Sequence, residues 1–82
     1  MEEINKNISA KLKGLRAEKG YSLEEMANKL EIHRETLRKY ENHPEFIEIG
    51  LLLKMLNIYD VTTIYFFELI YGKMPKSEEK EE

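Results

Sequence analysis

Apolar residues recur at helical spacing along most of this chain, and few residues are available to end strands in tight turns. Its 82 residues include only two prolines and four glycines. Ile8, Leu12 and Leu15 lie at positions i, i+4 and i+7, so they share one face of a helix. We expect this helix to end at Lys19, because Gly20 follows it and glycine favours a helix C-terminus. The pattern therefore predicts an all-α fold.

Four further helices are predicted. Ser22 and Glu25 form a capping-box pattern, in which the serine oxygen accepts a backbone N–H and the glutamate reaches back, so the second helix runs from Ser22 to Leu30. The other three are expected at about 33–42, 47–59 and 62–71, with Thr62 capping the last. The expected inward residues of the second and third helices are Leu23, Met26, Ala27, Leu30, Leu37 and Tyr40, and the fourth helix carries the apolar residues Ile49, Leu52, Leu53 and Leu56. Residues 1–72 would form one domain, and 73–82 a charged, flexible tail.

The second and third helices have the spacing of a helix-turn-helix. Glu31 and Ile32 leave only a tight connection between them. Ala27 is small where the following helix would cross, Ile32 would fill the turn, and Leu37 would hold the following helix in place. In such a motif the second helix projects from the surface and fits the major groove of DNA.

The chain resembles the phage-repressor and Cro-like helix-turn-helix proteins, often called XRE-type regulators. The likeness spans about residues 8–68 and is carried by Leu15-Arg16, by SLEEMANKLEIHRETLRKYEN, and by LLLKM followed by YDVTTIYFF. Each piece is short, but their order and spacing together are specific. The resemblance implies a five-helix, repressor-like domain that binds double-stranded operator DNA as a two-fold dimer.

The family's base-reading positions fall on the exposed side of the third predicted helix, at His33, Arg34, Glu35, Arg38 and Lys39. The residue types fit that role. Arg34 and Arg38 lie at i, i+4, and an arginine can donate two hydrogen bonds to guanine O6 and N7. Glu35 would accept from a cytosine amino group or hold an arginine in position. The alternative is a charged helix face that only meets solvent.

The resemblance also places a phosphate contact just after that helix and an ion pair beneath it. The predicted phosphate contacts are Asn42 and Thr36, with Ser22, Lys11, Lys13 and Lys19 as sequence-independent contacts. Arg16 and Glu41 match an ion pair that ties the first helix to the recognition helix. The chain departs from the family at Leu23, where a phosphate-binding glutamine is usual, and at Glu31, where glycine is usual.

The charge distribution bears on a nucleic-acid partner. A net charge of -3 counts against one, because phosphate neutralisation supplies most of such binding. Residues 11–43 nevertheless hold eight Lys and Arg against six Glu, whereas residues 44–82 hold four Lys against eight Asp and Glu. The acidic excess therefore lies away from the predicted recognition helix.

The last predicted helix, with the run IYFFELIY, is apolar around too much of its circumference for burial against one small core. We expect part of it to form a homodimer interface. The expected interface residues are Tyr65, Phe66, Leu69, Ile70 and Tyr71. The alternative is a large core that this helix fills by itself.

No enzyme, cofactor or metal is expected. His33 and His43 lie at opposite ends of a predicted helix, without a third ligand at a suitable spacing. There is no glycine-rich phosphate loop or nucleophile motif. The chain also has no cysteine, no export signal and no apolar run of the ~18 residues that a membrane span needs. A cytoplasmic location without a membrane partner is therefore expected.

Two kinds of function remain open from the sequence. The first is a sequence-specific DNA-binding transcriptional regulator, a repressor that acts as a dimer and is controlled by its concentration, by a protein partner or by proteolysis. The second is a protein-interaction adaptor or antirepressor that keeps the fold and acts through a protein partner. An antitoxin would combine DNA binding with binding of its toxin.

Overall fold

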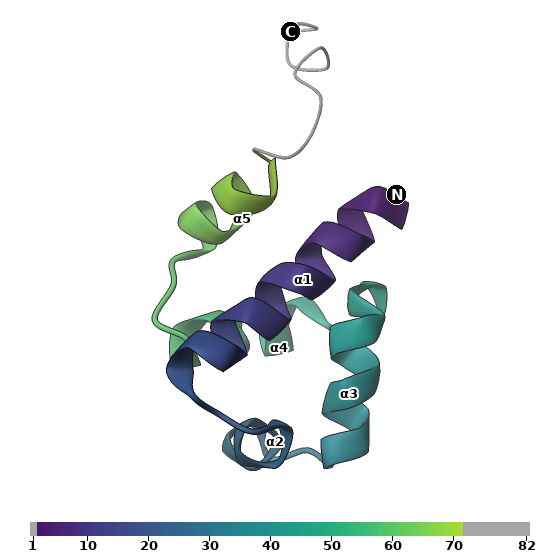
Figure 1. Cartoon of the computed structure of the whole chain (residues 1–82), viewed down its shortest axis with the longest axis vertical. Coiled ribbons are helices and arrows are strands. Elements are labelled where there is room, and N and C mark those ends of the chain that lie inside the picture. The colour runs from purple at the N-terminus through teal and green to yellow at the C-terminus, as the bar shows by residue number, and fades with distance from the viewer. Residues whose placement is uncertain (1, 72–82) are drawn as a thin grey trace, which may run out of the picture.

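A computed structural model describes residues 2–71 of the chain, and in this range it contains helices and no strand (Figure 1). The elements are α1 (Glu2–Lys19), α2 (Leu23–Leu30), α3 (Arg34–Asn42), the 3-10 helix η1 (Pro44–Phe46), α4 (Ile49–Ile58) and α5 (Thr63–Tyr71). The prediction of an all-α fold with five α-helices is confirmed for these residues. The predicted tail at 73–82 and the domain boundary at 72 lie outside the described residues.

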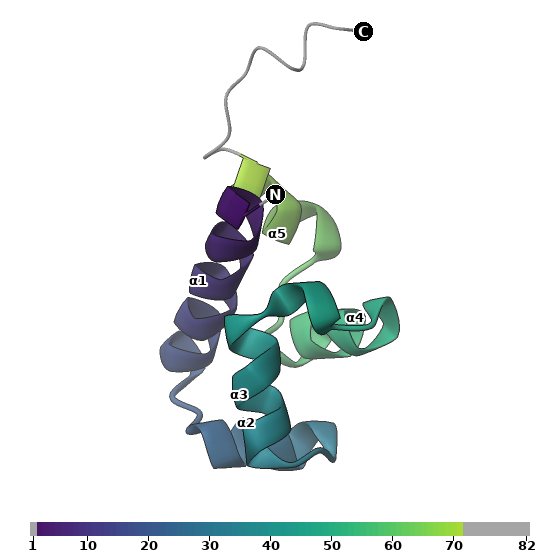
Figure 2. The ribbon, with the colours of Figure 1, turned by 90° about the vertical axis from the view of Figure 1, so that its right-hand side faces the viewer.

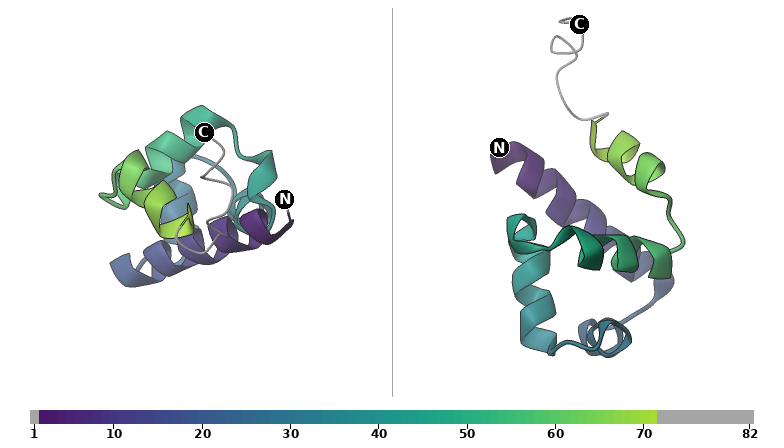
Figure 3. Two further views of the ribbon diagram at one scale, coloured as in Figure 1. Left: turned by 90° about the horizontal axis from the view of Figure 1, so that it is seen from above. Right: turned by 180° about the vertical axis from the view of Figure 1, so that it is seen from behind.

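The helices are arranged around α1, which crosses the molecule from α5 at one end to α2 at the other (Figure 1). In a view turned by 90°, α3 runs upward from α2, and α4 lies beside α3 (Figure 2). From behind, α4 and η1 together connect the end of α3 to α5 (Figure 3). As a result, α2 and α3 form one end of the molecule and α5 the other.

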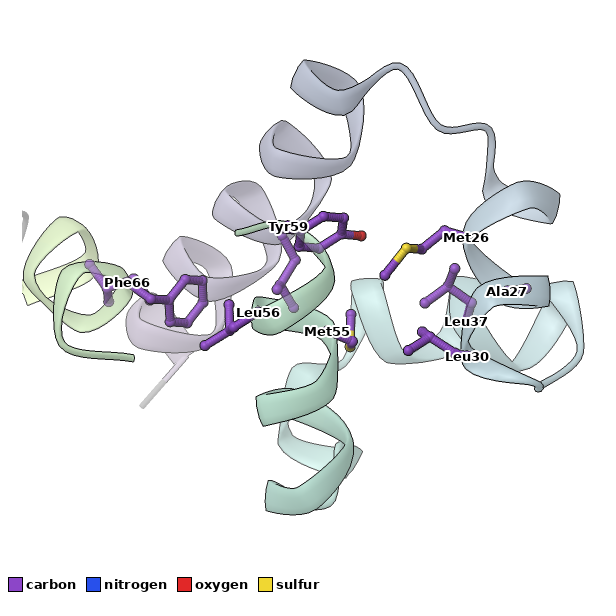
Figure 4. Close-up of a cluster of buried hydrophobic side chains, with 10 residues drawn as sticks. Met26, Ala27, Leu30, Leu37, Met55, Leu56, Tyr59 and Phe66 are labelled. Atoms are coloured by element: carbon purple, nitrogen blue, oxygen red, sulfur yellow. The ribbon is translucent and has the colours of Figure 1, made fainter. Parts of the chain in front are cut away.

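The core collects apolar side chains from all five α-helices (Figure 4). Its buried members are Leu12, Met26, Ala27, Leu30, Leu37, Met55, Leu56, Tyr59, Phe66 and Ile70. Of the apolar residues on α4, Ile49 and Leu53 lie outside the core and are 66% and 44% exposed. The apolar residues of α4 surround the helix, so their spacing did not identify the side that packs against α2 and α5.

Local signals in the sequence place the helix starts. The Ser22 hydroxyl accepts a hydrogen bond from the Glu25 amide at 3.0 Å, and the Glu25 carboxylate accepts one from the Ser22 amide at 2.8 Å. The predicted capping box is therefore confirmed. The Thr62 hydroxyl likewise accepts from the Tyr65 amide at 3.1 Å, which satisfies a free N–H in the first turn of α5.

The structure corrects the prediction for α5. Phe66 and Ile70 were expected in a dimer interface, but they are 0% and 3% exposed and belong to the core of the chain itself. Leu69 is half-buried, and the side chain of Tyr71 lies outside the described part. The large apolar side chains that the described part of α5 exposes are Ile64, Tyr65 and Phe67. Only one side of the helix is therefore used by the core.

The described residues contain no single helix with the length and apolar character to cross a membrane. Taken together, residues 49–58 and 63–70 have the required length and composition, but the chain bends by 98° between them. Both segments also place side chains in the core, among them Met55 and Phe66.

Candidate nucleic-acid interface

α2 and α3 form a compact pair joined by the turn at Glu31 and Ile32. Ala27 is buried where the two helices meet, as its small size predicted, and Leu37 fixes the inner face of α3. The turn is closed by a hydrogen bond of 3.0 Å from the Ile32 amide to the Ala27 carbonyl. Because Leu37 is buried, the opposite side of α3, which carries Arg34 and Arg38, faces solvent.

A buried ion pair fixes the far end of α3 against α1. Glu41 is 2% exposed, and its carboxylate accepts two hydrogen bonds from the Arg16 guanidinium, at 2.8 Å from Nε and 3.1 Å from Nη2. Arg16 also donates to the Tyr21 carbonyl at 3.2 Å, and the Ser9 hydroxyl donates to the Glu41 carbonyl. The hydrogen bond with Glu41 raises the pKa of Arg16 above its ordinary value. The ion pair implied by the resemblance is confirmed, and its charges are unavailable to a partner.

All five predicted base-reading residues are exposed on α3 or at its start. His33 is the N-cap residue, and its side chain makes no capping hydrogen bond. The Glu35 carboxylate lies between the two arginines, 3.1 Å from Nε of Arg38 and 3.8 Å from Nε of Arg34. Glu35 therefore contacts both arginines, and both of its roles toward DNA stay predictions. The Nζ atom of Lys39 lies 5.1 Å from the ring centroid of Phe46.

Two neighbours of these residues were missed from the sequence. Glu24 of α2 has Oε1 at 3.9 Å from Nη1 of Arg34. Phe46 is exposed in η1, where its ring lies beside Lys39 and 5.9 Å from the ring of His43. Helical spacing relates residues within one helix, so it gave no signal for either contact.

The predicted phosphate contacts divide into separate groups. Thr36 is half-buried on α3, whereas Ser22 is exposed at the start of α2. Lys13 lines a hollow between α1 and η1 together with Asn42, at the end of α3. Lys11 and Lys19 line a different hollow, between α1 and α5. The structure thus brings Lys13 and Asn42 together and does not place Lys11 and Lys19 with them.

Comparison with known proteins identifies related sequences. A family model described as helix-turn-helix matches residues 12–66. The chain is 38% identical over 64 residues to a candidate HTH-type transcriptional regulatory protein of Pyrococcus horikoshii, and 36% identical over 63 residues to one of Pyrococcus abyssi. These alignments cover 78% and 77% of this chain. The chain spans about a fifth of the length of these curated relatives, since 20% of each is covered. No solved structure matches.

Proposed function

The chain belongs to the helix-turn-helix family, and from this membership we propose that it is a transcriptional regulator that binds double-stranded DNA in a sequence-specific manner. Family membership agrees with the expectation that it is not an enzyme. The observation that carries the proposal is the pair of exposed arginines, Arg34 and Arg38, on the side of α3 opposite the buried Leu37. A rigid helix that presents two guanidinium groups in one direction has the chemistry for a guanine-containing site.

The spacing of these arginines fits a short recognition site. Side chains at i and i+4 have Cβ atoms about 5–6 Å apart, and bases along one strand rise about 3.4 Å per step. Arg34 and Arg38 would therefore read base pairs about two steps apart, with His33 and Lys39 beside them. Because Glu41 is neutralised by Arg16, it adds little repulsion toward the phosphates. Asn42 and Lys13 would bind the backbone where α3 ends.

The regulator would act as a repressor that occupies its operator as a homodimer. The exposed side of α5, formed by Ile64, Tyr65 and Phe67, supports the dimer because it places apolar side chains in solvent. Two-fold symmetry would set two recognition helices about 34 Å apart, one turn of DNA. A cytoplasmic location and control by a protein partner belong to the same proposal.

Binding selection from random duplexes tests the proposal. Arg34→Ala and Arg38→Ala should each cost about 1–3 kcal/mol of binding free energy at particular base pairs and relax the preference there. The control Lys13→Ala should weaken binding to all sequences alike and lower the slope of log K against log salt by about 1. Equal binding by the wild type and the Arg34→Ala, Arg38→Ala double variant would contradict the assignment.

The second candidate function is a protein adaptor with the same fold. The observation in its favour is again the exposed apolar side of α5, together with the net charge of -3. This candidate predicts that the wild type selects no duplex even at low ionic strength, whereas a variant altered on α5 loses a protein partner. The duplex selection therefore separates the two candidates before any variant is made.

A further inference from the structure

Glu24 is an exposed carboxylate in the first turn of α2, and it lies beside a candidate base-reading residue of α3. We propose that Glu24 is a specificity-determining residue. It positions the Arg34 guanidinium for a guanine edge and competes with phosphate for it, which raises the ratio of specific to non-specific DNA affinity. This inference rests on the proposed function.

The geometry places Arg34 between carboxylates from two helices. Nη1 of Arg34 lies 3.9 Å from Oε1 of Glu24, and Nε lies 3.8 Å from Oε2 of Glu35. Glu35 in turn lies 3.1 Å from Nε of Arg38. The side chains of Glu24, Arg34, Glu35 and Arg38 therefore form a row in which negative and positive charges alternate. Glu24 comes from α2, and the other three come from α3. A guanidinium carries five N–H donors, so these contacts leave donors of Arg34 free for DNA.

The charges of the helix-turn-helix explain why one carboxylate matters here. Together, α2, α3 and the turn between them carry four cations against five carboxylates. The cations are Lys29, Arg34, Arg38 and Lys39, and the carboxylates are Glu24, Glu25, Glu31, Glu35 and Glu41. Glu41 is paired with Arg16, so the remaining charges of the motif balance. Non-specific DNA binding depends almost entirely on net positive charge, and the motif provides little of it.

Removal of Glu24 would therefore act in opposite directions on the two kinds of complex. In a non-specific complex Arg34 contributes mainly its charge, which Glu24 offsets, so loss of the carboxylate should strengthen binding. In the specific complex Arg34 has to make two hydrogen bonds to one guanine. Without the Glu24 carboxylate the free Arg34 side chain adopts more orientations, so binding in this geometry costs more conformational entropy. Exposed ion pairs of this kind contribute little to folding stability, so the effect should be on binding.

The test compares Glu24→Gln with Glu68→Gln, which makes the same charge change on α5, at the other end of the molecule (Figure 1). Affinity for the selected operator duplex and for a scrambled duplex is measured over a series of salt concentrations. Glu24→Gln should raise affinity for the scrambled duplex about two- to fivefold and steepen its salt slope by about 0.9. Its affinity for the operator should stay equal or fall. Glu68→Gln should leave the ratio of the two affinities unchanged.

A second variant separates the role of Glu24 from a general effect of charge. In an Arg34→Ala background, Glu24→Gln should no longer change the affinity ratio, because the residue it positions is absent. An unchanged ratio in Glu24→Gln, an equal change in Glu68→Gln, or a change that persists without Arg34 would overturn the inference. A wild-type chain that selects no duplex would instead overturn the proposed function on which the inference rests.

Discussion

At the scale of single residues, Tyr59 places a polar hydroxyl group inside the apolar core. It is 1% exposed, its hydroxyl has no hydrogen-bond partner in the described part of the chain, and the hydroxyl points toward the Met26 side of the core (Figure 4). Burial raises the pKa of Tyr59 above its ordinary value, and the nearby Glu41 carboxylate adds to the shift. An unpaired buried hydroxyl lowers the stability of the fold, so the ring of Tyr59 stabilises the core by packing while its hydroxyl group does not.

Tyr59→Phe should therefore raise the free energy of unfolding at pH 7 by about 1 kcal/mol, since it removes the unpaired hydroxyl and keeps the ring. The pKa of Tyr59 is raised in the folded state, so above the unfolded value near 10 the unfolded chain loses the phenol proton more readily than the folded chain, and the free energy of unfolding falls as pH rises. The wild type should then lose more stability above pH 10 than Tyr59→Phe does. Urea unfolding at both pH values measures this.

The control for that prediction is Tyr65→Phe, because Tyr65 is exposed and its hydroxyl is free to meet water. It should change stability little at pH 7. A Tyr59→Phe protein that is less stable than the wild type at pH 7 would mean that the hydroxyl has a favourable partner, such as a bound water.

At the scale of elements, the turn between α2 and α3 stores backbone strain. Glu31 has φ 62°, in the left-handed region that glycine adopts at low cost, and it is the C-cap residue of α2. Its amide still donates to the Asn28 carbonyl at 3.1 Å, so the helix end is satisfied despite the residue type. The departure from glycine at this position was noted in the sequence, and the left-handed backbone confirms why glycine is usual there.

Glu31→Gly should raise the free energy of unfolding by about 0.5–1 kcal/mol, since glycine relieves the left-handed strain. Asp60→Gly, at φ 63°, should give a smaller gain because aspartate enters that region more readily. Glu31→Gln removes the same charge without relieving strain, and it should give no comparable gain. Thermal unfolding of the three variants decides the matter, and a destabilised Glu31→Gly protein would contradict the argument.

At the scale of the whole molecule, α5 divides its apolar residues between the core and solvent. Phe66 packs inward, while Ile64 and Tyr65 remain exposed, and Tyr65 lines the hollow between α1 and α5. A small domain that exposes neighbouring large apolar residues has a surface suited to association. α5 lies at the end of the molecule away from α2, so a dimer built on it would leave the recognition helices free (Figure 1).

Ile64→Lys should shift the proposed homodimer to monomer without lowering the stability of the monomer fold, because Ile64 is exposed. Phe66 lies two residues further along α5 and is buried. Phe66→Ala should instead lower the free energy of unfolding by about 3–5 kcal/mol through loss of core packing. Sedimentation equilibrium and urea unfolding separate the two effects. A wild-type chain that sediments as a monomer at high concentration would remove the basis for a dimer on this helix.

The sequence by itself determined the helices, several of their caps and the family. The interactions responsible are local, because helical spacing and the caps at Ser22 and Thr62 act within a few residues of each helix start. The match of Arg16 and Glu41 to a family pattern likewise located a buried ion pair that spacing alone would not have found. The helices and caps could be read because each has a fixed separation along the chain, and the ion pair because the family pattern fixes its two positions.

Only the tertiary structure decided which sides of α4 and α5 face inward and which side chains meet across the turn. Both helices are apolar around most of their circumference, so no polar face marked the outside, and packing against α1 made Phe66 a core residue and left Ile64 exposed. The approach of Glu24 to Arg34 depends on how α2 and α3 cross. Contacts between helices follow from packing geometry, which no spacing within one helix encodes.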